Sequence, residues 1–195
     1  MSSSDALVEI WGVYQISLDS LYVASQSVET KEDSLGLLKN TLFMQLSDEE
    51  ALRRIDSGKS GIDDYLVLSL WTVFERQLYE YLQQESGRLP ERGASSFSSS
   101  FRKKLDREIE YWRIDDILDE VFGAILCKEL IGAVKQIKKY RDWLVHRNPK
   151  KAFPGNITPQ RAYDTLSDVL SCLRDHPDLS CATEETGVEA CRKGD

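Results

Sequence analysis

Residues 62–85 carry apolar side chains nearly all round a helix, and this segment constrains the fold more than any other. It opens on two acids, Asp63 and Asp64, and apolar residues then follow at helical spacing from Leu66 to Leu82. A helix that is apolar on most faces packs in the middle of a helical bundle or between two subunits. We therefore predict a long central helix over residues 62–85.

Helical patterns cover most of the remaining chain as well. Its five prolines and eleven glycines are mostly clustered, which leaves long stretches without helix-breaking residues. Thr158 before Pro159 is a helix-start signal, and Pro149 disfavours helix at the residue before it. The other predicted helices are 6–28, 34–56, about 101–113, 114–126, 128–146 and one from 159 onward. An N-cap signal at Ser47 can divide the helix 34–56. A serine-rich connector is predicted at 87–100. Together these helices predict an all-α protein, an up-and-down bundle of about four to six helices.

Length and composition fit a single soluble domain. At 195 residues the chain is long enough to bury a core but short for two domains. We assign residues 1–176 to one helical domain and the polar, acidic residues 177–195 to a disordered tail. The sequence shows no secretory signal and no apolar run of the about 18 residues that a membrane span needs, so we expect a cytoplasmic protein without a membrane partner. Cys127 and Cys172 have apolar neighbours and are predicted to be reduced core residues.

The charge is distributed unevenly along the chain. The formal net charge is −8, which argues against a protein that coats nucleic acid. Residues 135–151 nevertheless contain seven basic residues and one acid, a local net charge of +6. A basic patch on an acidic protein suits a small anionic target such as one phosphodiester group. The alternative is an ordinary solvated face near the end of a helix.

Arg141 occupies an unusual position on the predicted helix 128–146. With 100° per residue, it lies at the centre of the apolar stripe, where a guanidinium is costly unless it is paired or opens onto a cleft. Glu75 lies on an inward stripe of the predicted central helix in the same way. We therefore expect Glu75 to pair with Arg141 or to orient it. The alternative is a buried ion pair with a structural role only.

His146 follows Arg141 by five residues, about 140° further round an ideal helix. A histidine at a helix C-terminus is a suitable group for acid–base catalysis at neutral pH. One straight helix does not easily direct both side chains at one atom. Either the helix loosens before Pro149, or a working site takes its groups from two copies of the chain.

Residues 138–149, KKYRDWLVHRNP, resemble the signature of the HEPN superfamily (higher eukaryotes and prokaryotes nucleotide-binding). That signature is an arginine followed after four to six residues by a histidine, often with a polar residue directly after the arginine, near the end of a late bundle helix. Residues 69–76, SLWTVFER, resemble the earlier central helix of the family, which often carries an inward acid. The resemblance covers about residues 62–174.

The resemblance implies a homodimer that cuts RNA without a metal or another cofactor, at a cleft between the two chains. By analogy, His146 would transfer protons and Arg141 would stabilise the charged transition state. Asp142, Glu75 and Asn148 would position these groups or the RNA. Phosphate would be bound by Lys138, Lys139 and Arg147. The setting would be a toxin–antitoxin pair, an antiviral or abortive-infection response, or RNA processing, with an antitoxin or another protein as partner.

Two other functions fit the same residues. The chain can be an inactive HEPN-type binding or scaffold module that works with a partner protein, an interpretation that the acidic net charge favours. It can also be a structural helical dimer in a larger assembly. Tyr140 and Trp143 are interpreted as packing residues rather than as platforms for RNA bases. With two histidines and no nearby cluster of acids, the sequence does not predict a catalytic metal site.

Overall fold

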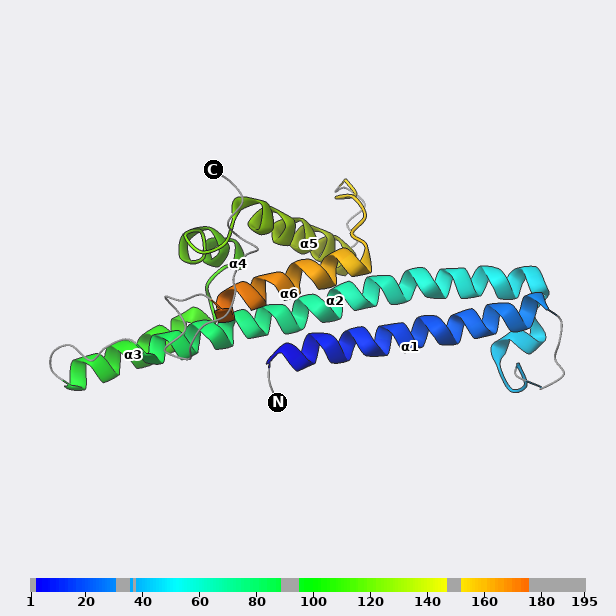
Figure 1. Ribbon diagram of the computed structural model, residues 1–195, viewed down its shortest axis with the longest axis horizontal. Helices are drawn as coiled ribbons and strands as arrows, with labels where there is room; N and C mark the ends of the chain where they lie inside the picture. The colour runs from blue at the N-terminus through cyan, green and yellow to red at the C-terminus, as the bar shows by residue number, and fades with distance from the viewer. Residues whose placement is uncertain (1–2, 31–35, 37, 89–94, 147–151, 176–195) are drawn as a thin grey trace.

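The computed structural model describes residues 3–30, 36, 38–88, 95–146 and 152–175, and these residues form helices joined by short turns. No strand occurs in these ranges, so the predicted all-α fold is confirmed. The molecule is elongated, because two long helices run along much of its length, and the helices that follow them in the chain lie along the left and middle part in Figure 1. The predicted tail, residues 177–195, lies outside the described residues.

The long axis is an antiparallel hairpin of α1 (Ser3–Glu29) and α2 (Asp48–Arg88) (Figure 1). The connection contains a short 3-10 helix, η2 (Leu42–Gln45). Two residues of this connection, Gly36 and Asn40, have positive φ angles of 60° and 65°, a conformation that glycine and asparagine adopt more readily than other residues. The turn therefore depends on residue types suited to a left-handed backbone.

Helix α2 corrects the prediction of separate helices over 34–56 and 62–85. It begins after Ser47, whose hydroxyl accepts a hydrogen bond from the Glu50 amide at 3.3 Å, so the predicted N-cap is confirmed. It then continues through Gly58 and Gly61 without a break. Glycine lowers helix stability by about 1 kcal/mol relative to alanine, a cost that packing can offset. Here Leu21 of α1 packs over Gly58, and α1 supports α2 at this position.

Helix α3 (Ser95–Ile109) begins earlier and ends earlier than predicted. Residues 95–100 are helical, although the sequence predicted a connector over 87–100. The rest of that connector is residues 87 and 88, which belong to α2, and residues 89–94, which lie outside the described residues. Phe97 and Phe101, one turn apart, stack with ring centroids 6.2 Å apart and support the first turns of α3.

The predicted helix 114–126 is shorter and irregular. It consists of one turn, α4 (Ile114–Asp116), followed by a turn of π-helix, η3 (Ile117–Val121). The wider turn is closed by a hydrogen bond of 2.9 Å from the Phe122 amide to the Ile117 carbonyl. Gly123 follows directly, and a Cβ atom on it would overlap the carbonyl oxygen of Asp119. Glycine is thus required where the chain leaves the π-helical turn.

Helices α5 (Lys128–His146) and α6 (Pro159–Asp175) confirm the two remaining predictions. Thr158 caps α6 as predicted, because its hydroxyl accepts a hydrogen bond from the Arg161 amide at 3.3 Å. Both helices lie against α2. Helix α5 lies on the opposite side of α2 from α1 (Figure 1). Cys127, before α5, is exposed rather than in the core, since it precedes the apolar stripe of that helix. None of the described helices combines the length and the apolar composition that crossing a membrane requires.

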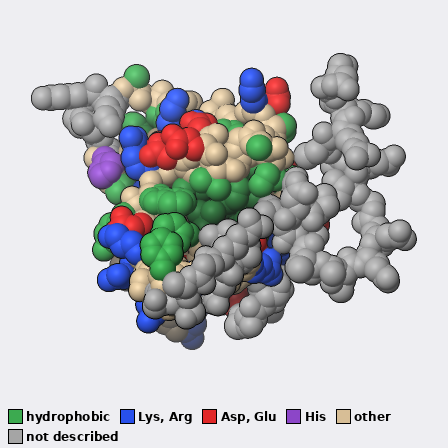
Figure 2. Space-filling model, turned by 90° about the vertical axis from the view of Figure 1, so that its left-hand side faces the viewer, with side chains coloured by type: hydrophobic (Ala, Val, Ile, Leu, Met, Phe, Trp, Pro, Cys, Tyr) green, Lys and Arg blue, Asp and Glu red, His purple; other side chains and the backbone are tan. Residues whose placement is uncertain are grey.

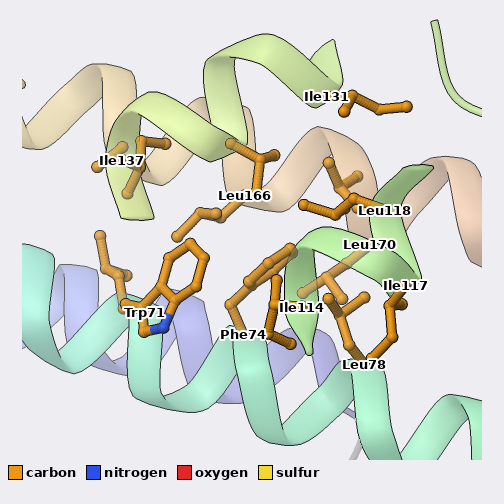
Figure 3. Close-up of a cluster of buried hydrophobic side chains, with 14 of the residues drawn as sticks. Trp71, Phe74, Leu78, Ile114, Ile117, Leu118, Ile131, Ile137, Leu166 and Leu170 are labelled. Carbon is orange, nitrogen blue, oxygen red and sulfur yellow. The ribbon is translucent and has the colours of Figure 1, made fainter. Parts of the chain in front are cut away.

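The main core lies between α2, α4, η3, α5 and α6. Figure 3 shows Trp71 and Phe74 of α2 pointing toward Leu166 of α6, while Leu78 lies beside Ile114 and Ile117. A second, smaller cluster lies near the connection between α1 and α2 and is built around Val28, Ala51 and Ile55. Between Ile55 and Leu66 no residue of α2 is buried, so the two clusters are separate along this helix. The predicted central helix is confirmed as the element that the others pack around.

Candidate functional site around Arg141 and His146

Helix α5 buries one face, and Arg141 lies within that face. The buried residues recur every three or four positions: Ile131, Val134, Ile137, Tyr140 and Leu144. The side chain of Arg141 is 24 % exposed, so most of it is withdrawn from water. A guanidinium in such a position needs partners, and α2 supplies two of them.

The Arg141 guanidinium is held from three sides. Its Nη2 donates to Glu75 Oε2 of α2 at 3.2 Å, and its Nη1 donates to Asp142 Oδ1 at 2.9 Å. Its central carbon lies 5.2 Å from the centre of the Trp71 ring, a cation–π distance. The predicted pairing of Glu75 with Arg141 is therefore confirmed. The group cannot rotate without losing charge-assisted hydrogen bonds, which fixes its direction.

Asp142 also belongs to a chain of alternating charges that reaches α4. Lys138 Nζ lies 3.5 Å from Asp142 Oδ2 and 3.2 Å from Asp115 Oδ2. Lys138, which was expected to bind RNA phosphate, thus lies between two carboxylates. A second ion pair, Lys135 with Asp119 at 2.5 Å, joins η3 to α5. Asp142 is thus held by Arg141 through one carboxylate oxygen and by Lys138 through the other.

His146 lies at the end of α5 and is exposed. Within the described residues it makes no hydrogen bond or ion pair, so none of them joins it to the Arg141 cluster. Figure 2, which views the left-hand side of Figure 1, shows histidine atoms at the molecular surface. The structure thus brings Arg141, Asp142, Glu75 and Lys138 together and leaves His146 outside. Lys139 is exposed as well, and Arg147 and Asn148 lie outside the described residues.

Three residues of this site were not singled out from the sequence. Trp71 was assigned to the core, although its position four residues before Glu75 puts both on one helix face. Tyr79, one turn after Glu75, donates to the Trp112 carbonyl at 3.0 Å. Burial and, to a smaller extent, the Glu75 carboxylate raise the pKa of Tyr79 above its usual value, while Arg141 opposes the shift. Asp115 left no periodic signal, because its role depends on how α4 lies against α5.

An aromatic cluster lies beside the last turn of α5. Trp143 and Phe153 meet edge to face with ring centroids 4.9 Å apart, and Tyr140 lies 6.4 Å from Trp143. The Tyr140 hydroxyl donates to Asp64 Oδ1 of α2 at 2.8 Å. Tyr140 is buried and Trp143 half-buried, as the interpretation of both as packing residues requires. The cluster and the Tyr140–Asp64 bond fix the end of α5 against α2 and the segment before α6.

In the parts of the chain that the structure describes, no group of three or more histidine, cysteine, aspartate or glutamate side chains is arranged to hold a metal ion. Comparison of the chain with models of protein families, with curated proteins and with solved structures finds no match. A functional assignment therefore depends on the arginine–histidine motif and on the geometry around it.

Proposed function

We propose that this chain is a metal-independent endoribonuclease of the HEPN type, with Arg141 and His146 as its catalytic residues. The observation that carries the proposal is the immobilised guanidinium of Arg141, held by Glu75, Asp142 and Trp71 on the helix that ends in an exposed histidine. Catalysis by electrostatic stabilisation needs a cation whose position is fixed before the reaction begins. A purely solvated arginine at a helix end would not need three partners.

The chemistry follows from the two groups. The ribose 2′-oxygen forms a bond to phosphorus, and the bond from phosphorus to the 5′-oxygen of the next nucleotide breaks. The 2′-hydroxyl must lose a proton and the 5′-oxygen must gain one, and His146 transfers protons of this kind. Arg141 stabilises the extra negative charge on the phosphorane-like transition state. The products are a 2′,3′-cyclic phosphate and a 5′-hydroxyl, and the proton balance requires no metal.

A second copy of the chain completes the site in this proposal. Five residues separate Arg141 from His146, and the two side chains leave the helix about 140° apart. In a two-fold dimer with the ends of α5 facing each other, Arg141 of one chain meets His146 of the other. Lys138, Lys139 and Arg147 would then border the cleft and attract phosphate, with Asn148 holding the RNA or the helix end. Growth arrest, antiviral defence and RNA processing are the settings for such an activity, with an antitoxin or another protein as partner.

One observation favours a second candidate function, an inactive binding or scaffold module of the same type. Two carboxylates already neutralise the Arg141 guanidinium, and His146 has no hydrogen bond to the cluster among the described residues. An arginine satisfied in this way can serve only to join α5 to α2. In that case the motif is retained for packing, and the chain acts through a partner protein.

The decisive experiment is RNA cleavage in EDTA. The substrates are total cellular RNA and a labelled single-stranded RNA of mixed sequence, with a 2′-O-methyl version as a control without the nucleophile. We expect the wild type to cut only RNA with free 2′-hydroxyls and to leave 2′,3′-cyclic phosphate ends. His146→Ala and Arg141→Gln should each reduce the rate by about a hundredfold or more.

Matched controls separate these effects from general damage. His176→Ala changes the other histidine of the sequence, and Arg76→Ala removes an exposed arginine of α2 that pairs only with Glu80 in the described part of the chain. Both should cut RNA at the wild-type rate. An intact substrate with wild type, or equal cutting by His146→Ala, would exclude the nuclease and leave the scaffold module.

A further inference from the structure

The outer face of α1 carries an exposed apolar stripe that the fold does not use. Val13, Ile16 and Val23 are 61 %, 67 % and 53 % exposed, although they repeat at the spacing of one helix face. The opposite face of α1, with Leu7 and Val28, packs against the rest of the molecule. In Figure 1, α2 lies on one side of α1 and no helix lies on the other. Large exposed side chains in one row are a feature of interaction surfaces.

Small residues complete this stripe. Ser20 and Ser27 follow Ile16 and Val23 by four residues, and their hydroxyls donate to the carbonyls of those two residues at 2.8 Å. Because each hydroxyl proton is already used within α1, a helix packed on this face leaves no serine donor unsatisfied. The spacing of 13, 16, 20, 23 and 27 alternates between three and four residues, which is the seam of helix-to-helix packing. The face is therefore shaped for another helix.

Charge indicates which helix it accepts. Residues 3–29 contain four acids and no lysine or arginine. Two of these acids are exposed and form no ion pair with any described residue: Glu9, which continues the row one turn before Val13, and Asp19, which lies beside it. A second copy of α1 would bring acids against acids, and RNA or an anionic membrane would be repelled. A helix with lysine or arginine beside its apolar seam would find both apolar contact and opposite charge.

We propose that the outer face of α1, defined by Val13, Ile16, Ser20, Val23 and Ser27, is the docking site for an amphipathic helix with basic flanks from a partner protein. The partner presents apolar residues to Val13, Ile16 and Val23, and its cations face Glu9 and Asp19. This surface is separate from the Arg141 site, since α1 and α5 lie on opposite sides of α2 (Figure 1). Partner docking and RNA cleavage are thus independent properties.

The test uses a synthetic helix as the probe and the full chain as the receptor. The probe is a fluorescent peptide of about four heptads with leucine and isoleucine in the seam and lysine at the flanking positions. A second peptide has glutamate at the same flanking positions. Fluorescence anisotropy should show that the lysine peptide binds, that the glutamate peptide binds at least about tenfold more weakly, and that added salt weakens the former.

Variants of the chain locate the binding site. Ile16→Ser and Val23→Ser should each weaken binding of the lysine peptide by about tenfold, because each removes apolar area from the contact. Asp19→Asn should weaken it less and reduce its salt dependence. Leu42→Ser and Met44→Ser are matched controls, since both side chains are exposed on η2 rather than on α1. These controls should bind the peptide as the wild type does.

Any of three results would overturn the proposal. The first is equal binding of both peptides, and the second is binding of the lysine peptide that Ile16→Ser and Val23→Ser leave unchanged. The third is self-association of the wild-type chain in sedimentation velocity that Ile16→Ser abolishes, which would assign the face to a second copy. Circular dichroism should remain that of the wild type in every variant, because the substituted side chains are exposed.

Discussion

Arg141 of α5 and Glu75 of α2 form an ion pair of 3.2 Å between two helices that are far apart in the sequence. Replacing Glu75 by Gln keeps the size of the side chain and removes its charge. We expect the free energy of unfolding to fall by about 1 kcal/mol, since both side chains are partly exposed and water screens the pair. Urea unfolding followed by circular dichroism measures this loss. Arg141→Gln should cost more, about 2 kcal/mol, because it also removes the cation from Trp71. Additive losses in the double variant would mean that the pair contributes nothing.

Two tyrosines with different surroundings predict opposite responses to removal of the hydroxyl. The Tyr14 hydroxyl donates to Asp63 Oδ1 at 2.8 Å, whereas the buried Tyr81 hydroxyl has no hydrogen-bond partner in the described structure. Tyr14→Phe should lower the free energy of unfolding by about 1.5 kcal/mol, the value for a hydrogen bond to a charged group. Tyr81→Phe should leave it unchanged or raise it. Equal losses in the two variants under thermal or urea unfolding would contradict this prediction.

Stability at alkaline pH should depend on the same two phenols. Burial, with Asp63 adding to the effect, raises the pKa of Tyr14, and burial with Glu85 raises the pKa of Tyr81 to about 12. An unfolded tyrosine has a pKa of about 10, so the folded state holds these protons more tightly. The contribution of these two phenols to the free energy of unfolding is complete below about pH 10 and is lost as the pH rises toward 12. Urea midpoints measured across this range should fall less steeply in Tyr14→Phe than in the wild type.

Two glycines provide a matched pair for the π-helical turn. Gly123→Ala places a Cβ atom against the Asp119 carbonyl, and we expect a loss of roughly 1–3 kcal/mol in the free energy of unfolding. Gly132 lies inside α5 with open space where a Cβ atom would be, so Gly132→Ala should stabilise the protein by about 0.5–1 kcal/mol. Differential scanning calorimetry compares the two. A stabilising Gly123→Ala would show that η3 is not held in this form.

Mixing two inactive variants tests whether the proposed ribonuclease site spans two chains. A heterodimer of Arg141→Gln and His146→Ala has one site in which both Arg141 and His146 are intact, if each site takes one residue from each chain. An equal mixture should therefore recover about a quarter of the wild-type cleavage rate after subunit exchange. If both residues act within one chain, the mixture stays inactive.

The Arg141–Glu75 pair could be predicted because each charge is anomalous on its own helix. A charged residue at the centre of an apolar stripe needs a partner, and each anomaly pointed to the other. The helix-start signals at Ser47 and Thr158 were equally informative, since a hydroxyl cap is a local property of a few residues. These features depend on short-range spacing alone.

Other features depend on tertiary packing, which local patterns do not contain. The sequence predicted separate helices over 34–56 and 62–85, but α1 lies along α2, which stays helical through Gly58 and Gly61. The contact of Lys138 with Asp115 arises only when α4 folds back onto α5. The separation of His146 from the Arg141 cluster, in contrast, could be predicted from the angle of about 140° between the two residues on an ideal helix, because it depends on the geometry of one helix alone.

The two hydrophobic clusters along α2 give the hairpin an uneven resistance to local opening. The small cluster around Ile55 holds the connection between α1 and α2, while the large core around Phe74 holds the end that carries Glu75. Opening free energies follow the amount of buried apolar contact, so backbone amides near Ile55 exchange with solvent before those near Phe74. The hairpin therefore frays from its tip inward, and the turn of α2 beneath Arg141 is among the last to open.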